Sequence, residues 1–204
     1  FINIIEIERL FHMNMFENKV AIDFIKDKGY LSDVPFHPPD TYPELSTKDI
    51  NPKNNIYNGI RDLLHRLGLD NENYGSSDWN PFKNIVKPGM TVFLKPNTVR
   101  HFHVDGGDVL SVIVHASILR PILDYVCIAL KNEGKIVIGD SQVIFGRFEP
   151  AYKVSQIDAL LDWYRNQTKI PIECIDLRLV EGHRTYLFGK WGRRKIEKDP
   201  KGYS

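Results

Sequence analysis

TVFLKPNT (91–98), SILRPILDYVCIALKNEG (117–134) and KIVIGDS (135–141) are the segments of this 204-residue chain that decide its fold. The first and third are short apolar runs rich in β-branched residues, as strands are, and each ends at a turn signal. Between them, apolar residues recur at helical spacing, with Ser117 placed to cap the helix and Gly134 placed to close it. Strand, helix and strand in this order predict a parallel βαβ unit.

Further strands are expected on both sides of this unit. The runs KVAIDFI (19–25) and IPIECIDL (170–177) have strand composition, and residues 186–188 could form one more short strand. A second crossover helix should follow Ser155, which resembles the first residue of a capping box with Asp158. The repeated alternation of strand and helix predicts an α/β fold with an open, mostly parallel sheet and helices on both faces.

The domain organisation follows from these elements. We expect one α/β domain over residues 19–204, with its C-terminal part missing from the sequence, preceded by an arm or helix at 1–18. Apolar residues at helical spacing over 56–67 predict an additional amphipathic helix. The segment 143–153 reads as a loop. Residues 27–53 contain five prolines and no regular period, which predicts a long surface loop of a kind that is uncommon unless it is functional or disordered.

Composition excludes some partners and suggests a location. A net charge of +1 argues against a dedicated nucleic-acid-binding domain, and the short basic run at 193–195 is more typical of a solvated face. No run approaches the roughly 20 apolar residues that a membrane-spanning helix needs. Cys127 and Cys174, the two cysteines, both lie in apolar runs, which favours unpaired thiols and a reducing, cytoplasmic location. The sequence does not indicate an oligomeric state.

Four polar residues follow the two central strands at the point where each strand ends. Lys95 and Asn97 follow the first strand, and Asp140 and Ser141 end the second. Because the carboxyl ends of parallel strands meet at one edge of the sheet, we expect a ligand crevice there. In this hypothesis Lys95 anchors a small anionic metabolite and Asp140 acts as an acid, a base or a metal ligand. The alternative is a solvated lysine beside polar residues that only cap loops.

Histidines and aspartates gather in the loop after Asn97. His101, His103, Asp105 and Asp108 lie in the segment HFHVDGGD, where two imidazoles and two carboxylates could hold a divalent metal, the one cofactor that the sequence suggests. The spacing is also that of an exposed polar loop, which we favour. His115, just before the predicted helix, could face the same crevice as a ligand-binding residue or pack against the helix start. No glycine-rich phosphate loop, nucleophile elbow or C-x-x-C pair is present.

The segment Lys87-Pro-Gly-Met-Thr-Val-Phe-Leu-Lys-Pro-Asn97 and the later GKIVIGDS (134–141) resemble the domain of unknown function family 362. The resemblance covers about residues 19–204, and KPN and GDS are its most specific motifs. It implies an α/β domain, in a family that includes fusions to iron–sulfur modules and has no settled activity. Val114 stands where the family has a threonine before the histidine, and the later K-x-K-T-H and LKN segments are absent, so the resemblance implies an N-terminal portion. Two cysteines cannot ligate a four-cysteine cluster.

Two functions from different classes remain open. The first is a domain that acts on or binds a small anionic metabolite at the strand ends. The second is a non-catalytic scaffold that presents the proline-rich loop 27–53 to a protein partner. The scaffold hypothesis predicts an exposed apolar patch around Phe36, Tyr42 and Trp79. The first predicts a concave site around a carboxylate whose pKa is shifted.

Overall fold

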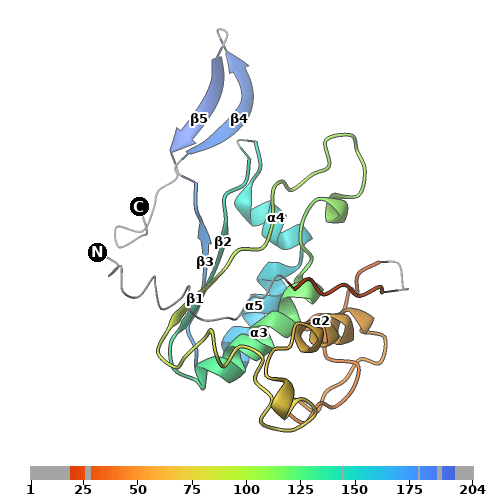
Figure 1. The fold of residues 1–204 in the computed structure, drawn as a ribbon. Helices are drawn as coiled ribbons and strands as arrows, with labels where there is room; N and C mark the ends of the chain where they lie inside the picture. Colours follow the sequence, from red (N-terminus) through yellow and green to blue (C-terminus); the bar gives the residue numbers. More distant parts are fainter. Residues whose placement is uncertain (1–18, 26–28, 144, 179, 188–189, 196–204) are drawn as a thin grey trace.

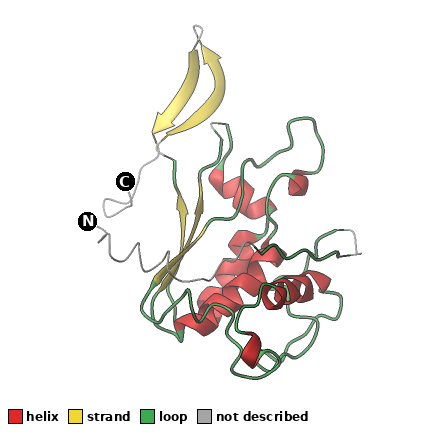
Figure 2. Cartoon of the chain, in the orientation of Figure 1, coloured by secondary structure: helices red, strands yellow, loops and turns green. Residues whose placement is uncertain are grey.

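The computed structural model describes residues 19–25, 29–143, 145–178, 180–187 and 190–195. It describes side chains up to residue 178. The predicted arm or helix at 1–18 lies outside the described residues. Figures 1 and 2 show a small sheet with helices beside it and a hairpin beyond its end.

The sheet is the predicted open, parallel sheet, with three strands in sequence order. It consists of β1 (Thr91–Leu94), β2 (Lys135–Asp140) and β3 (Ile172–Asp176), and both neighbouring pairs run parallel. The predictions of strands at 91–94, 135–138 and 172–177 are therefore confirmed to within a residue or two. The register sets Leu94 beside Ile138 and Asp140 beside Asp176, so all three strands end at one edge.

The helices that connect the strands pack on one face of this sheet. α3 (Ala116–Leu130) joins β1 to β2, and α4 (Phe148–Val154) and α5 (Ile157–Gln167) join β2 to β3. Right-handed crossovers between strands in sequential order put every connecting helix on the same side. Ile136, Ile138 and Ile172 of the sheet share one core with residues of α3 and α5.

The remaining helix adds a second layer outside α3. α2 (Asn55–Arg66) fulfils the prediction at 56–67 and packs on α3, and Figure 1 shows it on the side away from the strands. Two short 3₁₀ turns, η1 (Asn71–Asn73) and η2 (Val109–Ser111), lie in the loops. For the described part of the chain, helices thus cover one face of the sheet, whereas the sequence predicted both.

The predicted strand at 19–25 is wrong. The segment has no regular structure and pairs with no described strand. One side of its alternating pattern rests on α2, where Gly59 lets Ile25 and Asp23 approach closely. The other side, Val20, Ile22 and Phe24, is 77–85% exposed. The segment therefore lies against a helix surface and not beside a neighbouring strand, with its side of Val20, Ile22 and Phe24 exposed.

Two helix ends also differ from prediction. Residues 148–154, read as loop, form α4, and Ser155 ends that helix, with its hydroxyl donating to the carbonyl of Tyr152. It caps no helix start, because Gln156 precedes α5 without a side-chain capping bond. At α3, the N-cap is His115 and not Ser117. Lys131 in the left-handed region closes that helix, while Gly134 (φ 114°) is required because a Cβ there would lie 2.3 Å from the Met90 carbonyl oxygen.

The proline-rich segment is a loop, as predicted, but it is packed into the fold. Asn54, the N-cap of α2, donates through Nδ2 to the carbonyl oxygens of Phe36 and His37 at 3.0 and 2.9 Å. Phe36 and Trp79 are fully buried, and Tyr42 is half-buried. The exposed apolar patch expected around these three residues is therefore absent from the described chain.

The last two strands form a separate antiparallel hairpin. β4 (Val180–Leu187) and β5 (Lys190–Lys195) pair with each other in a two-stranded sheet, which Figure 1 shows projecting past the end of the parallel sheet. The short strand predicted at 186–188 overlaps the end of β4. The basic residues 193–195 lie on β5.

Candidate functional site

The strand ends bring Lys95 and Asp140 into direct contact. Asp140 is the last residue of β2, and Lys95 is the first residue after β1, which the parallel register places alongside. The Lys95 ammonium forms an ion pair with Oδ1 of Asp140. The carboxylate is 2% exposed, whereas the lysine side chain is 55% exposed. The pair therefore joins a buried negative charge to a cation whose outer side faces solvent.

A chain of hydrogen bonds holds the buried carboxylate from the other side. Oδ2 of Asp140 accepts the backbone N–H of Thr98 at 2.7 Å and its hydroxyl at 3.0 Å. Nε2 of Gln142 in turn donates to the Thr98 hydroxyl oxygen at 2.8 Å. These bonds link the loop after β1 to the loop after β2. They also supply the donors that a buried carboxylate needs to remain charged.

A buried polar atom at this edge, Oε1 of Gln142, lacks a hydrogen-bond partner in the described chain. The hydroxyl of Tyr152 on α4 is also buried, near Thr98 and Cys174. Burial raises the pKa of Tyr152 above its ordinary value, and the nearby Cys174 and Asp140 raise it further. Tyr152 thus stays a neutral phenol. Unpaired buried polar atoms are uncommon, and Oε1 of Gln142 therefore suggests either bound water or a ligand group.

The electrostatics keep Asp140 ionised. Burial alone would raise the pKa of Asp140, but the bonds from Lys95, from the N–H groups of Thr98 and Ser141, and from the Thr98 hydroxyl outweigh it, so the pKa is lowered. A carboxyl group with a lowered pKa is a fixed negative charge at neutral pH. It is poorly suited to general acid chemistry, which needs a raised pKa.

The loops around this pair carry an excess of positive charge. Residues 95–102 and 141–147 contain Lys95, Arg100 and Arg147 and no acidic side chain, and Asp140 directly precedes the second loop. The two loops run together, since the N–H of Val143 donates to the carbonyl of Val99 and the N–H of Arg147 donates to Nδ1 of His101. The two loops that follow the strand ends thus carry three basic residues and no acidic one.

The other predicted ligand residues lie around the pair with different contacts. Asn97 is exposed, and its Nδ2 lies 3.5 Å from the Val112 carbonyl oxygen. Ser141 is also exposed and contributes its backbone N–H to the carboxylate of Asp140. The structure thus brings together Lys95 and Asp140, with Ser141 beside them, while the amide of Asn97 points toward the next loop.

His115 is a structural residue at the start of α3. Its Nδ1 accepts the N–H of Ser117 at 3.2 Å, and its ring stacks on Tyr30 at 4.5 Å and meets Phe36 edge-on at 5.3 Å. The residue is 1% exposed, and burial lowers its pKa to about 4. The second of the two alternatives, packing at the helix start, describes its placement.

His103 and Asp108 of the loop 101–108 cap local backbone, whereas His101 accepts the N–H of Arg147. Nδ1 of His103 accepts the N–H groups of Asp105 and Gly107, and Oδ1 of Asp108 accepts the N–H of Leu110. Among the described residues, no three His, Cys, Asp or Glu side chains are arranged to hold a metal ion. The described chain therefore gives no geometric support to the divalent-metal hypothesis.

Sequence reasoning missed Thr98, Gln142 and Tyr152. Thr98 and Gln142 follow the KPN and GDS motifs by one residue each, so their proximity to Asp140 was available as a signal. Tyr152 carried no such signal, because the sequence predicted a loop where its helix forms.

At the end of β3, Arg178 pairs with Asp176 at 2.6 Å and donates to the Gly146 carbonyl at 2.5 Å.

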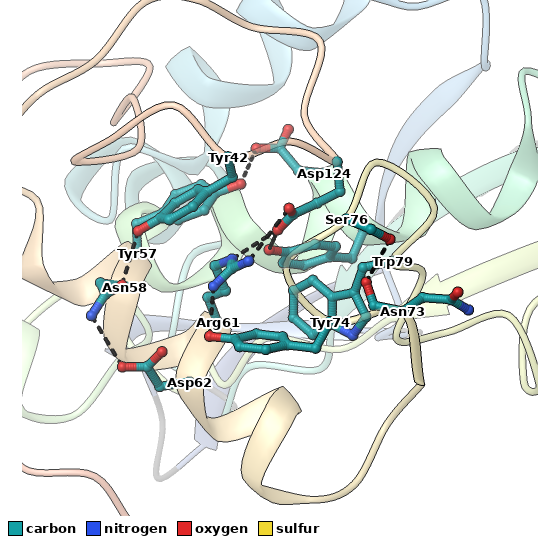
Figure 3. Close-up of polar contacts among 12 residues, drawn as sticks. Tyr42, Tyr57, Asn58, Arg61, Asp62, Asn73, Tyr74, Ser76, Trp79 and Asp124 are labelled. Atoms are coloured by element: carbon teal, nitrogen blue, oxygen red, sulfur yellow. Dashed lines mark hydrogen bonds and ion pairs between the residues drawn. The ribbon is translucent and has the colours of Figure 1, made fainter. Parts of the chain in front are cut away.

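A second polar cluster lies where the proline-rich loop meets α2 and α3. Arg61 donates to Glu44 at 2.7 Å and to the hydroxyl of Tyr74 at 2.7 Å. Its guanidinium lies 4.2–4.8 Å from the ring centroids of Tyr42, Tyr74 and Trp79. Figure 3 shows Arg61 surrounded by these rings, with Asp124 nearby. This enclosure leaves little of the cation for solvent, so the cluster reads as structural.

Comparisons of the chain with protein-family models, with curated proteins and with solved structures find no match. The resemblance to family 362 therefore remains a hypothesis that rests on the KPN and GDS motifs. No described helix has both the length and the apolar character that crossing a membrane requires. Cys127 and Cys174 are unpaired and half-buried, as the composition predicted.

Proposed function

We propose that this chain contains an α/β domain, related to family 362, that binds a small anionic metabolite at the carboxyl edge of its parallel sheet. The observation that carries this proposal is the pairing of a buried carboxylate with a half-exposed lysine. Asp140 fixes the position of the Lys95 ammonium, and the outer side of that ammonium remains available to a ligand oxygen. Arg100 and Arg147 on the bordering loops add favourable potential for an anion.

In this proposal Lys95 is the anchor and Asp140 is the group that positions it. The lowered pKa of Asp140 favours binding over acid–base chemistry, since a catalytic acid or base works best with a pKa near the working pH. The Ser141 hydroxyl lies at the surface of the same edge.

The scaffold hypothesis has less support. It expected the loop 27–53 and Trp79 to expose a joint apolar patch, but Phe36 and Trp79 are buried in the fold. A loop that packs its apolar side chains inward has mainly polar groups to offer a partner.

The test is anion binding measured by calorimetry on the 204-residue chain, with inorganic phosphate, succinate and citrate as probes. Lys95→Met should weaken binding of the preferred probe by roughly tenfold or more, because it removes a charge-assisted hydrogen bond. Lys169→Met, at another exposed lysine, is the matched control and should change nothing. Equal binding by the two variants, or no binding of any probe to the parent protein, would overturn the proposal.

A further inference from the structure

A groove lies on the helix side of the molecule, remote in sequence from the strand-end loops. It has a volume of about 520 Å³, within the range of small-molecule sites. Three segments line it: residues 44–49 of the proline-rich loop, the outer face of α3 from Arg120 to beyond its end, and α5 with the residue that follows it. The lining includes hydroxyl, amide and charged groups together with the half-buried indole of Trp163.

The charges in this groove cancel in pairs. Arg120 pairs with Asp124 at 2.9 Å, and Glu44 pairs with Arg61 behind the lining at 2.7 Å. At the rim, Lys48 and Asp49 are adjacent and of opposite sign. A groove without net charge gives neither an anion nor a cation a favourable potential. Its polar lining also offers little apolar contact surface to a wholly apolar ligand.

Asp124 is held rigidly, with one acceptor position left. Its Oδ2 accepts the hydroxyl of Tyr57 at 2.7 Å and Nε of Arg120, and its Oδ1 accepts the hydroxyl of Tyr164 (Figure 3 shows Tyr57 and Asp124). Burial raises the pKa of both tyrosines well above the ordinary value, so both remain donors. A carboxylate oxygen can accept two hydrogen bonds, and the bonds within the described chain leave Oδ1 one unfilled position. The side chain is 13% exposed.

Arg120 pairs with the same carboxylate from inside the fold, with a side chain that is 1% exposed. Its Nε donates to Asp124 and its Nη1 donates to the Pro35 carbonyl at 2.7 Å, while Nη2 makes no hydrogen bond within the described chain. Its guanidinium is held against the ring of Trp163, 4.3 Å from the centroid. A ligand hydroxyl can donate to the unfilled position on Oδ1 of Asp124, the more exposed member of the pair. A ligand carboxylate would be repelled by Asp124, and a ligand ammonium by Arg120.

We infer that this groove is a binding site for a neutral polyhydroxylated ligand of sugar size. Asp124 accepts a ligand hydroxyl, the rim hydroxyls and amides of Ser46, Thr47 and Gln167 meet further hydroxyls, and the half-buried edge of Trp163 completes the lining. The groove shares no residue with the strand-end site, so this inference can be tested independently of the proposed function.

The test uses ligand-detected NMR titrations of the 204-residue chain with D-glucose, D-galactose, myo-inositol and sucrose, and with citrate and putrescine as charged probes. At least one neutral probe should bind with a Kd of about 1 mM or below. Ser46→Trp, which places an indole in the groove from an exposed position, should weaken that binding about tenfold or more. Ser32→Trp, an exposed serine of the same loop outside the groove, is the matched control and should leave it unchanged.

Two further variants separate the possible readings. Asp124→Asn should weaken neutral-probe binding even where circular dichroism shows an intact fold, because the amide nitrogen cannot accept a hydroxyl proton. Lys95→Met should not affect it, which distinguishes this site from the strand-end site. The inference is overturned if no neutral probe binds, if only a charged probe binds, or if Ser46→Trp and Ser32→Trp bind the neutral probe equally.

Discussion

The carboxyl edge of the sheet and the cluster around Arg61 each bury an acidic side chain, but they neutralise it in different ways. Glu44 is fully buried and its partner Arg61 is 7% exposed, whereas Asp140 is 2% exposed and its partner Lys95 is 55% exposed. In the first pair, three aromatic rings lie against the guanidinium of Arg61. In the second pair, the lysine side chain is partly exposed to solvent. A closed pair contributes to a fixed structure, while an open pair keeps a cation available for a ligand.

The same substitution at the two cations should expose this difference most strongly. Arg61→Met leaves Glu44 buried without its cation and removes three aromatic contacts, so we expect a loss of about 3–5 kcal/mol in the free energy of unfolding. Lys95→Met leaves Asp140 with its bonds to Thr98 and removes only a half-exposed partner, for a loss of about 1 kcal/mol. Urea denaturation of both variants at neutral pH measures the two values.

A double variant separates charge from packing in this comparison. Arg61→Met combined with Glu44→Leu removes both charges and should recover part of the loss, because an uncompensated buried charge is then no longer present. Similar losses for Arg61→Met and Lys95→Met would show that the two regions do not differ as described.

The sequence predicted the sheet region far better than the loop–helix region. Short β-branched runs and a helical period between them were enough for the parallel βαβ unit, and the parallel topology then predicted that Lys95 and Asp140 would meet. Both inferences depend on local patterns and on one general rule of chain connection. The contact between these two residues therefore needed no knowledge of tertiary packing.

The loop–helix region could not be predicted in this way, because its contacts join residues far apart in sequence. Glu44 and Tyr125 are 81 residues apart and hydrogen-bonded, and no local pattern signals such a pair. Residues 19–25 fail for a related reason: their β-branched and aromatic composition favours an extended segment, but it does not show whether a strand or a helix lies beside that segment. The buried proline-rich loop shows that irregular sequence can still be packed.

His115 connects the two regions and should give the second-largest effect. It caps α3 close to the strand ends, and in the proline-rich loop it stacks on Tyr30 and meets Phe36 edge-on. Burial lowers its pKa to about 4 from an ordinary 6.5, so the folded state resists protonation and the unfolded state accepts it. Stability should therefore be full above about pH 6.5 and decline by up to about 3 kcal/mol as the pH falls to 4.

The check is the free energy of unfolding of the parent and of His115→Asn between pH 7 and about pH 4. Asparagine can still cap the helix but does not titrate. The variant should lose stability at neutral pH through its smaller ring contacts, yet show a flatter decline with acidification. A decline as steep as that of the parent would mean that His115 is not protonated on unfolding.

The smallest expected effect comes from Asp140, and it tests whether the open pair contributes to stability at all. Its pKa in the folded state lies below the ordinary 3.8, because the bonds from Lys95, Thr98 and Ser141 outweigh the effect of burial. The contribution of Asp140 to the free energy of unfolding is therefore present above about pH 4. It is lost as the pH falls through the folded-state pKa. Because Lys95 is half-exposed, this contribution should be only about 1 kcal/mol.

In Asp140→Asn, the free energy of unfolding should decline correspondingly less between about pH 4 and pH 2. Asp105→Asn, at an exposed aspartate, should follow the parent curve. If Asp140→Asn also follows the parent, the carboxylate is not stabilised in its charged form, and the anchor assigned to Lys95 loses its basis.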